Sequence, residues 1–299
     1  MSKWYGHVIG VNDFSLQIGP GVTGLLGPNG AGKSTLLQLA TGQLRPSQGE
    51  VRVLGQKPWN NAPLFRLLGL CPEQDAFFEW MTGREFLTSC ALMAGLGRRG
   101  ARVAAQRALE QVRMTEHANR AVRGYSKGMR QRTKLAQALV HDPRVLFLDE
   151  PLSGTDPVAR RELVDLVVEL GKSGRTIVVS SHVLHEVEAI TRQVVLMNRG
   201  RLVAFGDVHQ VRDLIDAHPH RIVLKCPDVR ALAAKLVRFD DVVGLEIHRN
   251  DGTIMIETHA PDQFYGRLPA LALQHDTPIE ELYSDDDDLE AVFKYLVHP

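Results

Sequence analysis

A run of nine residues contains the eight-residue pattern G-x-x-x-x-G-K-[ST], at residues 27–34, which is the spacing of a phosphate-binding loop. The nine residues are Gly27, Pro28, Asn29, Gly30, Ala31, Gly32, Lys33, Ser34 and Thr35. Glycines in such a loop let backbone N–H groups turn toward phosphate oxygens, and the N-terminus of a following helix adds partial positive charge. We expect Lys33 to reach the β- and γ-phosphates and the Ser34 hydroxyl to hold Mg²⁺. The loop therefore predicts a nucleotide site rather than a glycine-rich turn that binds nothing.

Two adjacent acids form the second candidate group. Asp149 and Glu150 follow the apolar residues Leu146, Phe147 and Leu148, which is the form that a magnesium-binding strand end takes in phosphate-loop ATPases. We expect Asp149 to support Mg²⁺, directly or through water, and Glu150 to act as the base that polarises the attacking water. Many strands end in exposed acids, so this interpretation depends on the phosphate loop earlier in the chain.

The elements around these residues predict an α/β fold. A buried strand is expected at residues 22–26 and a helix at residues 34–40, on either side of the phosphate loop. Further strands are expected at residues 145–148, 176–180 and 193–197, and a helix is expected to begin at Asp156 and Pro157 and to stop near Gly171. Because strands and helices alternate, we expect a largely parallel sheet.

The rest of the first domain shows two other patterns. Up to about residue 75 the chain is β-rich, with strands expected at residues 11–18 and 50–55. After residue 82 the apolar spacing becomes helical, at residues 84–94, 101–114 and 128–140. We therefore expect residues 1–210 to form a phosphate-loop ATPase core with a β-rich N-terminal part and an inserted helical subdomain at about residues 76–140.

A second, smaller module is expected at residues 218–299, after a linker. Its predicted order is strand, helix, two strands, helix and strand, at residues 221–225, 229–239, 242–248, 253–257, 262–274 and 279–283. A hairpin turn at Asn250, Asp251 and Gly252 separates the two middle strands. This order is that of a ferredoxin-like α+β module. A last helix is expected at residues 288–297.

Composition excludes some classes of function. Lysine plus arginine and aspartate plus glutamate number 35 each, for a net charge of zero, so the charge gives no reason to expect binding to nucleic acid. The three cysteines, Cys71, Cys90 and Cys226, form no C-x-x-C pair, which favours free thiols in a reducing compartment over a zinc site. Charged residues interrupt every long apolar run, so we expect no membrane span, and the N-terminus lacks the apolar core of a secretory signal.

A third motif lies at the start of the last helix of the predicted helical subdomain. The residues from Gly124 to Arg132 read Gly-Tyr-Ser-Lys-Gly-Met-Arg-Gln-Arg. This stretch resembles the signature of the ATP-binding cassette (ABC) family, commonly Leu-Ser-Gly-Gly-Gln, and in particular that of the nucleotide-binding subunits of ABC exporters. Ser126 and Gly128 match the family, whereas Tyr125, Lys127 and Met129 depart from it in a way familiar in exporter-type subunits. The resemblance implies that Ser126, Lys127 and Gly128 face a γ-phosphate at a helix N-terminus.

Other residues match the same family in order, over about residues 3–210. Tyr5 is where the family stacks an aromatic ring on adenine, and Gln74 matches the glutamine that senses Mg²⁺ and water and couples to the membrane partner. Residues 153–157 resemble the D-loop, with threonine at position 155 where leucine is usual. His182 matches the switch histidine that contacts the γ-phosphate.

Two metal interpretations are weaker. His182, His185 and Glu186 lack the H-E-x-x-H order, which argues against a metal site there. The acidic run from Asp285 to Asp288 is most simply a solvated cap of the last helix, with calcium binding as a second interpretation.

The resemblance implies a cytoplasmic ATPase that converts ATP and water to ADP and phosphate with Mg²⁺. It implies a head-to-tail dimer of two copies, which drives a separate permease at the inner face of the cell membrane. The aromatic residues Phe77, Phe78 and Trp80 are either a contact for that permease or core of the helical subdomain. The C-terminal module is expected to regulate or stabilise the dimer. One alternative is a soluble ABC ATPase acting on nucleic acid or ribosomes, and another is a module that holds ATP as a structural ligand.

Overall fold

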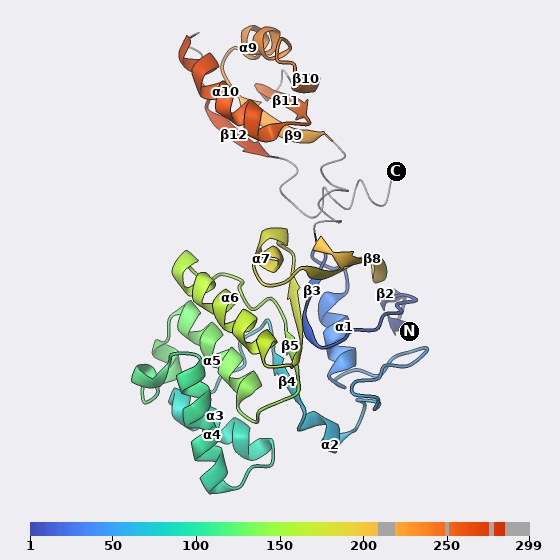
Figure 1. Ribbon diagram of the computed structural model, residues 1–299, viewed down its shortest axis with the longest axis vertical. Helices are drawn as coiled ribbons and strands as arrows, with labels where there is room; N and C mark the ends of the chain where they lie inside the picture. The colour runs from blue at the N-terminus through green and yellow to red at the C-terminus, as the bar shows by residue number, and fades with distance from the viewer. Residues whose placement is uncertain (209–218, 249–250, 275–277, 285–299) are drawn as a thin grey trace. The chain divides into compact units, whose positions relative to one another are not determined.

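The computed structural model describes residues 1–208, 219–248, 251–274 and 278–284. The chain divides into two compact units, Met1–Val208 and His209–Pro299, called here the N-terminal and C-terminal units (Figure 1). Among the described residues, no helix is both long enough and apolar enough to cross a membrane.

A six-stranded sheet forms the centre of the N-terminal unit, with the strand order β4-β5-β6-β3-β7-β8. Neighbouring strands from β4 to β7 are parallel, and β8 is antiparallel to β7. The bounds are β3 Gly21–Leu26, β4 Leu68–Cys71, β5 Val145–Leu148, β6 Thr176–Ser181, β7 Gln193–Asn198 and β8 Arg201–Asp207. The carboxyl ends of parallel strands meet at one edge of a sheet, where ligands bind in folds of this kind. The phosphate loop, the two acids and His182 follow β3, β5 and β6, so all of them begin at that edge.

Helices cover both faces of this sheet. They are α1 Lys33–Ala40, α2 Ala62–Phe65, α3 Gly83–Met93, α4 Arg98–Gln111, α5 Lys127–Leu139, α6 Pro157–Lys172 and α7 Leu184–Glu188, with short 3-10 turns at Thr115–His117 and Val122–Gly124. Successive side chains of strand β5 point to opposite faces of the sheet. Leu146 and Leu148 belong to the core beneath α3, α4 and α5, whereas Phe147 packs in the core beneath α1.

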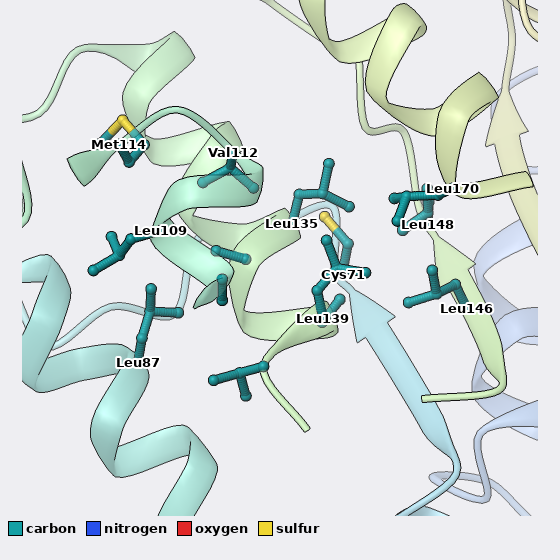
Figure 2. Packing of buried hydrophobic residues seen from close by; sticks show 14 of the residues in the cluster. Cys71, Leu87, Leu109, Val112, Met114, Leu135, Leu139, Leu146, Leu148 and Leu170 are labelled. Atoms are coloured by element: carbon teal, nitrogen blue, oxygen red, sulfur yellow. The ribbon is translucent and has the colours of Figure 1, made fainter. Parts of the chain in front are cut away.

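The helical subdomain shares one core with the sheet. Figure 2 shows Leu135 of α5 between Leu87 of α3 and Leu109 of α4 on one side and Leu146 and Leu148 of β5 on the other, all in one core. All five side chains are buried, and each such burial contributes about 1.5–3 kcal/mol. Helix α5 therefore sits firmly on the sheet and carries the signature residues at its first turn.

Two predicted strands are wrong. Residues 14–18 form no ladder, because β2 (Val8–Val11) already ends at Val11 and pairs only with β1 (Lys3–Tyr5). The alternation there reflects burial alone, since Phe14 is buried and Leu16 and Ile18 are partly buried in the core beneath α1.

The strand predicted at residues 50–55 is interrupted by a turn. Leu54 and Gly55 both have positive φ angles, 50° and 77°, and the turn is closed by the Val53 N–H to the Gln56 oxygen at 2.8 Å. The chain therefore reverses direction within the predicted strand. Among the described residues before β3, the named strands form one antiparallel sheet, which consists of β1 and β2.

The C-terminal unit has the ferredoxin-like order predicted for it. Its described elements are β9 His220–Lys225, α9 Val229–Leu236, β10 Val242–His248, β11 Thr253–Thr258, α10 Pro261–Gln274 and β12 Glu281–Ser284. They form an antiparallel sheet with the order β10-β11-β9-β12, and Ile222, Ile256 and Phe264 lie in its core. The predicted helix at residues 288–297 and the acidic run Asp285 to Asp288 lie outside the described residues.

Candidate functional site

The phosphate loop connects β3 to α1 by a backbone path that requires glycine. Gly32 precedes α1 with a φ angle of 102°, a left-handed conformation that side chains disfavour. A Cβ atom there would overlap the carbonyl oxygen of Gly10, and one on Gly27 would overlap the carbonyl oxygen of Met197. The loop is thus pressed against two neighbouring backbone segments, which fixes its course before the helix begins.

Lys33 lies inside this loop and faces the acids. Only 6% of the residue is exposed, and its Nζ donates to the carbonyl oxygens of Gly27 at 2.7 Å and Pro28 at 3.3 Å. The same Nζ lies 3.3 Å from Glu150 Oε1. The structure therefore joins the loop and the strand end that the sequence identified separately.

Glu150 is held between two functional side chains. Its Oε2 lies 3.0 Å from His182 Nδ1, while its Oε1 contacts Lys33. The residue is buried, with 7% exposed, and its backbone is left-handed with a φ angle of 47°. A carboxylate in this position has a cation on one side and an imidazole on the other, so both of its oxygens are held at fixed points.

Ser180 joins the two acids and was missed in the sequence. Its hydroxyl donates to Asp149 Oδ1 at 2.6 Å and accepts from the Glu150 N–H at 2.9 Å. The strand register is what would have identified Ser180. Strands β5 and β6 are parallel and Leu148 pairs with Val179. The residues that follow this pair, Asp149 and Ser180, are therefore neighbours. The sequence predicted both strands but offered no register.

Tyr5 lies beside the end of the phosphate loop. Its hydroxyl oxygen is 3.5 Å from Thr35 Oγ1, and Lys3 Nζ lies 5.5 Å from the centre of its ring. The residue is 44% exposed, which leaves ring surface available for stacking. The structure therefore brings Tyr5 to the loop although the two are far apart in the sequence.

The signature residues form a separate surface. Ser126 caps α5 by accepting from the Met129 N–H at 3.3 Å, and the Lys127 side chain lies against Gly154. Gly128 is close to Ala159, to which a Cβ at that glycine would come within 3.3 Å. The start of α5 thus packs on the predicted D-loop and on α6. In the described part of the chain, no hydrogen bond or ion pair joins these three signature residues to the phosphate loop.

The loop after β4 carries Gln74, whose side chain is exposed. Among the described residues, no hydrogen bond joins Gln74 to Asp149 or Glu150. The loop is instead held on α5, because Lys134 Nζ donates to the Glu73 oxygen at 2.6 Å and lies 3.2 Å from Asp75 Oδ1. Sequence reasoning missed this attachment.

A second pair of charges extends the attachment. The two terminal guanidinium nitrogens of Arg130 donate hydrogen bonds to the two carboxylate oxygens of Glu79, at 2.7 and 2.9 Å. This hydrogen bonding lowers the pKa of the Glu79 carboxyl. The three aromatic side chains of this loop, Phe77, Phe78 and Trp80, differ in their exposure. Phe77 packs against the helical core, whereas Phe78 and Trp80 are 48% and 71% exposed with ring centres 5.3 Å apart.

The donor chemistry fits Mg²⁺. Ser34, Gln74 and Asp149 offer hydroxyl, amide and carboxylate oxygens, which are the ligands this cation prefers. Within the described ranges, no group of three or more His, Cys, Asp or Glu side chains is placed to hold a metal ion. Glu186, from the alternative metal interpretation, bonds instead to Ser181 at 2.9 Å.

A glycine loop ahead of a helix, a buried lysine, and two acids and a histidine at the same edge of a parallel sheet define a phosphate-loop ATPase. The comparisons with known proteins give the family. A family model described as ABC transporter matches residues 11–153. The ABC transporter ATP-binding protein YxlF of Bacillus subtilis is 40% identical over 213 residues, which is 71% of this chain and 70% of that protein. The chain therefore belongs to the ATP-binding proteins of ABC transporters, and it is an ABC ATPase.

Solved structures agree. The structure of an ATP-binding subunit of an ABC transporter matches with a TM-score of 0.64 and 26% identity, over 72% of this chain and 90% of that one. A dimeric ATP-binding cassette with ADP and phosphate bound, in a post-hydrolysis state, matches with a TM-score of 0.63. It covers 69% of this chain and 95% of that one at 20% identity, so it supports the fold alone. The predicted fold class and ATP binding are confirmed.

Proposed function

We propose that this chain is the ATP-hydrolysing subunit of an ABC exporter, which pairs head to tail with a second copy around two ATP molecules and drives a separate membrane permease. One observation carries the proposal. Lys33, Glu150 and His182 form one cluster, and the signature residues with the D-loop form another. The Ser153 N–H donates to the Glu150 carbonyl oxygen at 3.2 Å, but among the described residues no side-chain hydrogen bond or ion pair joins the two clusters. Each chain thus offers two halves of a site, and the second copy would supply the complementary half.

The contacts suggest how the reaction proceeds. The phosphates of ATP would compete with Glu150 for the Lys33 ammonium, because both are anions and the lysine lies at the helix N-terminus. Once released, Glu150 Oε1 would be free to take a proton from water, with His182 beside Oε2, from which its Nδ1 lies 3.0 Å in this structure. The water oxygen then bonds to the γ-phosphorus as the bond to ADP breaks.

Mg²⁺ would be held by Ser34 and Asp149 together with Gln74. When bound, it neutralises charge on the β- and γ-phosphates. The predicted role of Gln74 requires its loop to approach the strand ends, which is consistent with an exposed position at the same sheet edge. Tyr5, beside Thr35, would stack on the adenine.

The exporter and permease parts of the proposal rest on two features. The stretch from Gly124 to Met129 has the form familiar in exporter-type subunits. Phe78 and Trp80 expose apolar rings on the loop after Gln74, and exposed apolar patches are typical of sites of protein contact. We infer that the permease docks there, which would hold the chain at the inner face of the cell membrane.

For the C-terminal unit, we propose a role in stabilising or regulating the dimer. It contains an antiparallel sheet with its own core. Removing residues 209–299 should weaken ATP-dependent dimer formation, measured by size-exclusion chromatography. Unchanged dimerisation and ATP hydrolysis would disprove this role.

Glu150→Gln tests the central proposal. Loss of a general base typically slows a reaction by about 10²- to 10⁴-fold, so this variant should bind ATP, lose turnover and accumulate as an ATP-dependent dimer. Glu110→Gln is the matched control, because Glu110 is an exposed residue of α4 that bonds to Gln106. Wild-type turnover in Glu150→Gln would refute the role of Glu150, and a monomer in saturating ATP would refute the shared site.

A further inference from the structure

Ser180 occupies an unusual place for a hydroxyl group. It is 0% exposed and follows Ile177, Val178 and Val179, three buried apolar residues of β6. A buried polar group is costly unless it is hydrogen-bonded. In this case both of its bonds go to the residues that carry the proposed chemistry, Asp149 and Glu150.

We propose that Ser180 is a positioning residue for ATP hydrolysis, whose hydroxyl fixes the Asp149 carboxylate and the backbone turn that directs Glu150 into the site. This inference rests on the proposed function, because it assumes the roles given above to the two acids. Ser180 itself has no role in binding phosphate or in proton transfer.

The direction of the two hydrogen bonds follows from the donor inventory. A hydroxyl has one proton and two lone pairs, and a backbone N–H can only donate. Since the Glu150 N–H donates to Ser180 Oγ, the serine proton is available for Asp149 Oδ1, 2.6 Å away. The bond occupies Oδ1 and leaves Oδ2 of Asp149 for the cation.

The Glu150 backbone explains why an anchor is needed. Its φ angle of 47° lies in a region that non-glycine residues rarely occupy and that persists only where the surroundings hold it. The bond from the Glu150 N–H to Ser180 is one such restraint, and the Asp149 N–H, bonded to the Cys71 oxygen at 2.9 Å, is another. The first of these acts at the strained residue itself.

The neighbouring serine serves another element. Ser181 donates to Glu186 Oε2 at 2.9 Å and accepts from the Val183 N–H at 3.0 Å, so its hydroxyl is directed to α7. Of the two adjacent serines, only Ser180 bonds to the acids.

The test compares Ser180→Ala, Ser180→Thr and Thr191→Val. Ser180→Ala removes the hydroxyl with little loss of volume, and Ser180→Thr restores it. Thr191 is the matched control, because its hydroxyl likewise makes one donated and one accepted bond: it donates to the Val22 carbonyl oxygen at 2.6 Å and accepts from the Gln193 N–H at 3.1 Å. Thermal unfolding is followed for all three variants to check that each is folded.

Two measurements separate positioning from general destabilisation. At saturating Mg²⁺, Ser180→Ala should lower kcat by about 10- to 100-fold, the usual cost of losing a partner that orients a catalytic or metal-binding group, with KM for ATP changed by less than about threefold. In equilibrium titrations with a fluorescent ATP analogue, the Mg²⁺ concentration at half-saturation should rise in Ser180→Ala. Ser180→Thr should recover most of both effects, and Thr191→Val should change neither.

Three results would overturn the proposal: wild-type kcat and Mg²⁺ dependence in Ser180→Ala, no recovery in folded Ser180→Thr, or an equal loss in Thr191→Val. Glu150→Gln, measured alongside, tells the two proposals apart. If ATP hydrolysis is slow in Glu150→Gln but has the wild-type rate in Ser180→Ala, only the role of Ser180 is refuted. If ATP hydrolysis has the wild-type rate in Glu150→Gln, the proposed function is refuted.

Discussion

Replacing Lys134 with methionine is predicted to release the loop that contains Gln74 from helix α5. The Lys134 side chain is 5% exposed, and its ammonium bonds the Glu73 carbonyl oxygen and the Asp75 carboxylate, at 2.6 and 3.2 Å. Methionine keeps most of the buried alkyl chain and removes both bonds. The change therefore isolates the charge from the packing.

The magnitude follows from the kind of bond that is lost. A hydrogen bond that involves a charged group contributes about 1.5–3 kcal/mol, so local opening of the loop should become roughly 10- to 100-fold more frequent. Arg130→Met should have a smaller effect, because Glu79 is exposed and exposed ion pairs contribute little. The order of the two variants is as informative as the size of the effect.

Hydrogen–deuterium exchange of peptides that cover residues 73–81 measures this opening. Lys57→Met is the matched control, since Lys57 pairs with Glu50 at 3.1 Å in another loop and should leave exchange at residues 73–81 unchanged. Wild-type exchange rates in Lys134→Met, or a larger effect in Arg130→Met, would show that the loop is held by something other than the buried lysine.

Three further predictions concern other parts of the chain. Ser126→Arg should block the nucleotide half-site of the partner copy, so mixed dimers with one variant chain should have one working site, whereas full turnover in the homodimer would refute the shared site. A photo-crosslinker at Phe78 or Trp80 should capture the co-expressed permease, and repeated failure to do so would argue that these rings serve another contact. Burial raises the pKa of the Cys71 thiol to about 12 and that of Cys90 to about 11, so at pH 8 both remain protonated and iodoacetamide should label them only after unfolding. Fast labelling of the native protein, detected by mass spectrometry, would contradict this.

The sequence predicted the parts of the site that are fixed by local patterns. The phosphate loop needs its glycines, and a strand followed by acids is visible without a partner strand, so Lys33 and Glu150 were identified although their contact is long-range. The expected helices at residues 84–94 and 128–140 are present as α3 and α5 with small shifts at their ends. In each case the residues that determine the structure are close together in the chain.

What the sequence did not reveal depends on register and on loop packing. Ser180 bonds to Asp149 only because β5 and β6 are aligned as they are, and a strand pattern contains no register. The strand expected at residues 11–18 is wrong beyond Val11 for a related reason. Alternating burial of Phe14, Leu16 and Ile18 tells which face is covered, but it does not tell whether another strand lies alongside.

Helix α5 connects two functions through one of its faces. Ser126, Arg130 and Lys134 are spaced by four residues, so they lie on the same side of the helix. The first caps the end proposed to face the nucleotide of the partner, and the other two hold the loop with Gln74, Phe78 and Trp80. Because Arg130 and Lys134 attach the loop to α5, we expect a displacement of the helix to be passed to the loop. Lys134→Met should therefore reduce stimulation of ATP hydrolysis by the permease more than it reduces basal hydrolysis, and equal losses in both would show that the loop and the helix do not move together.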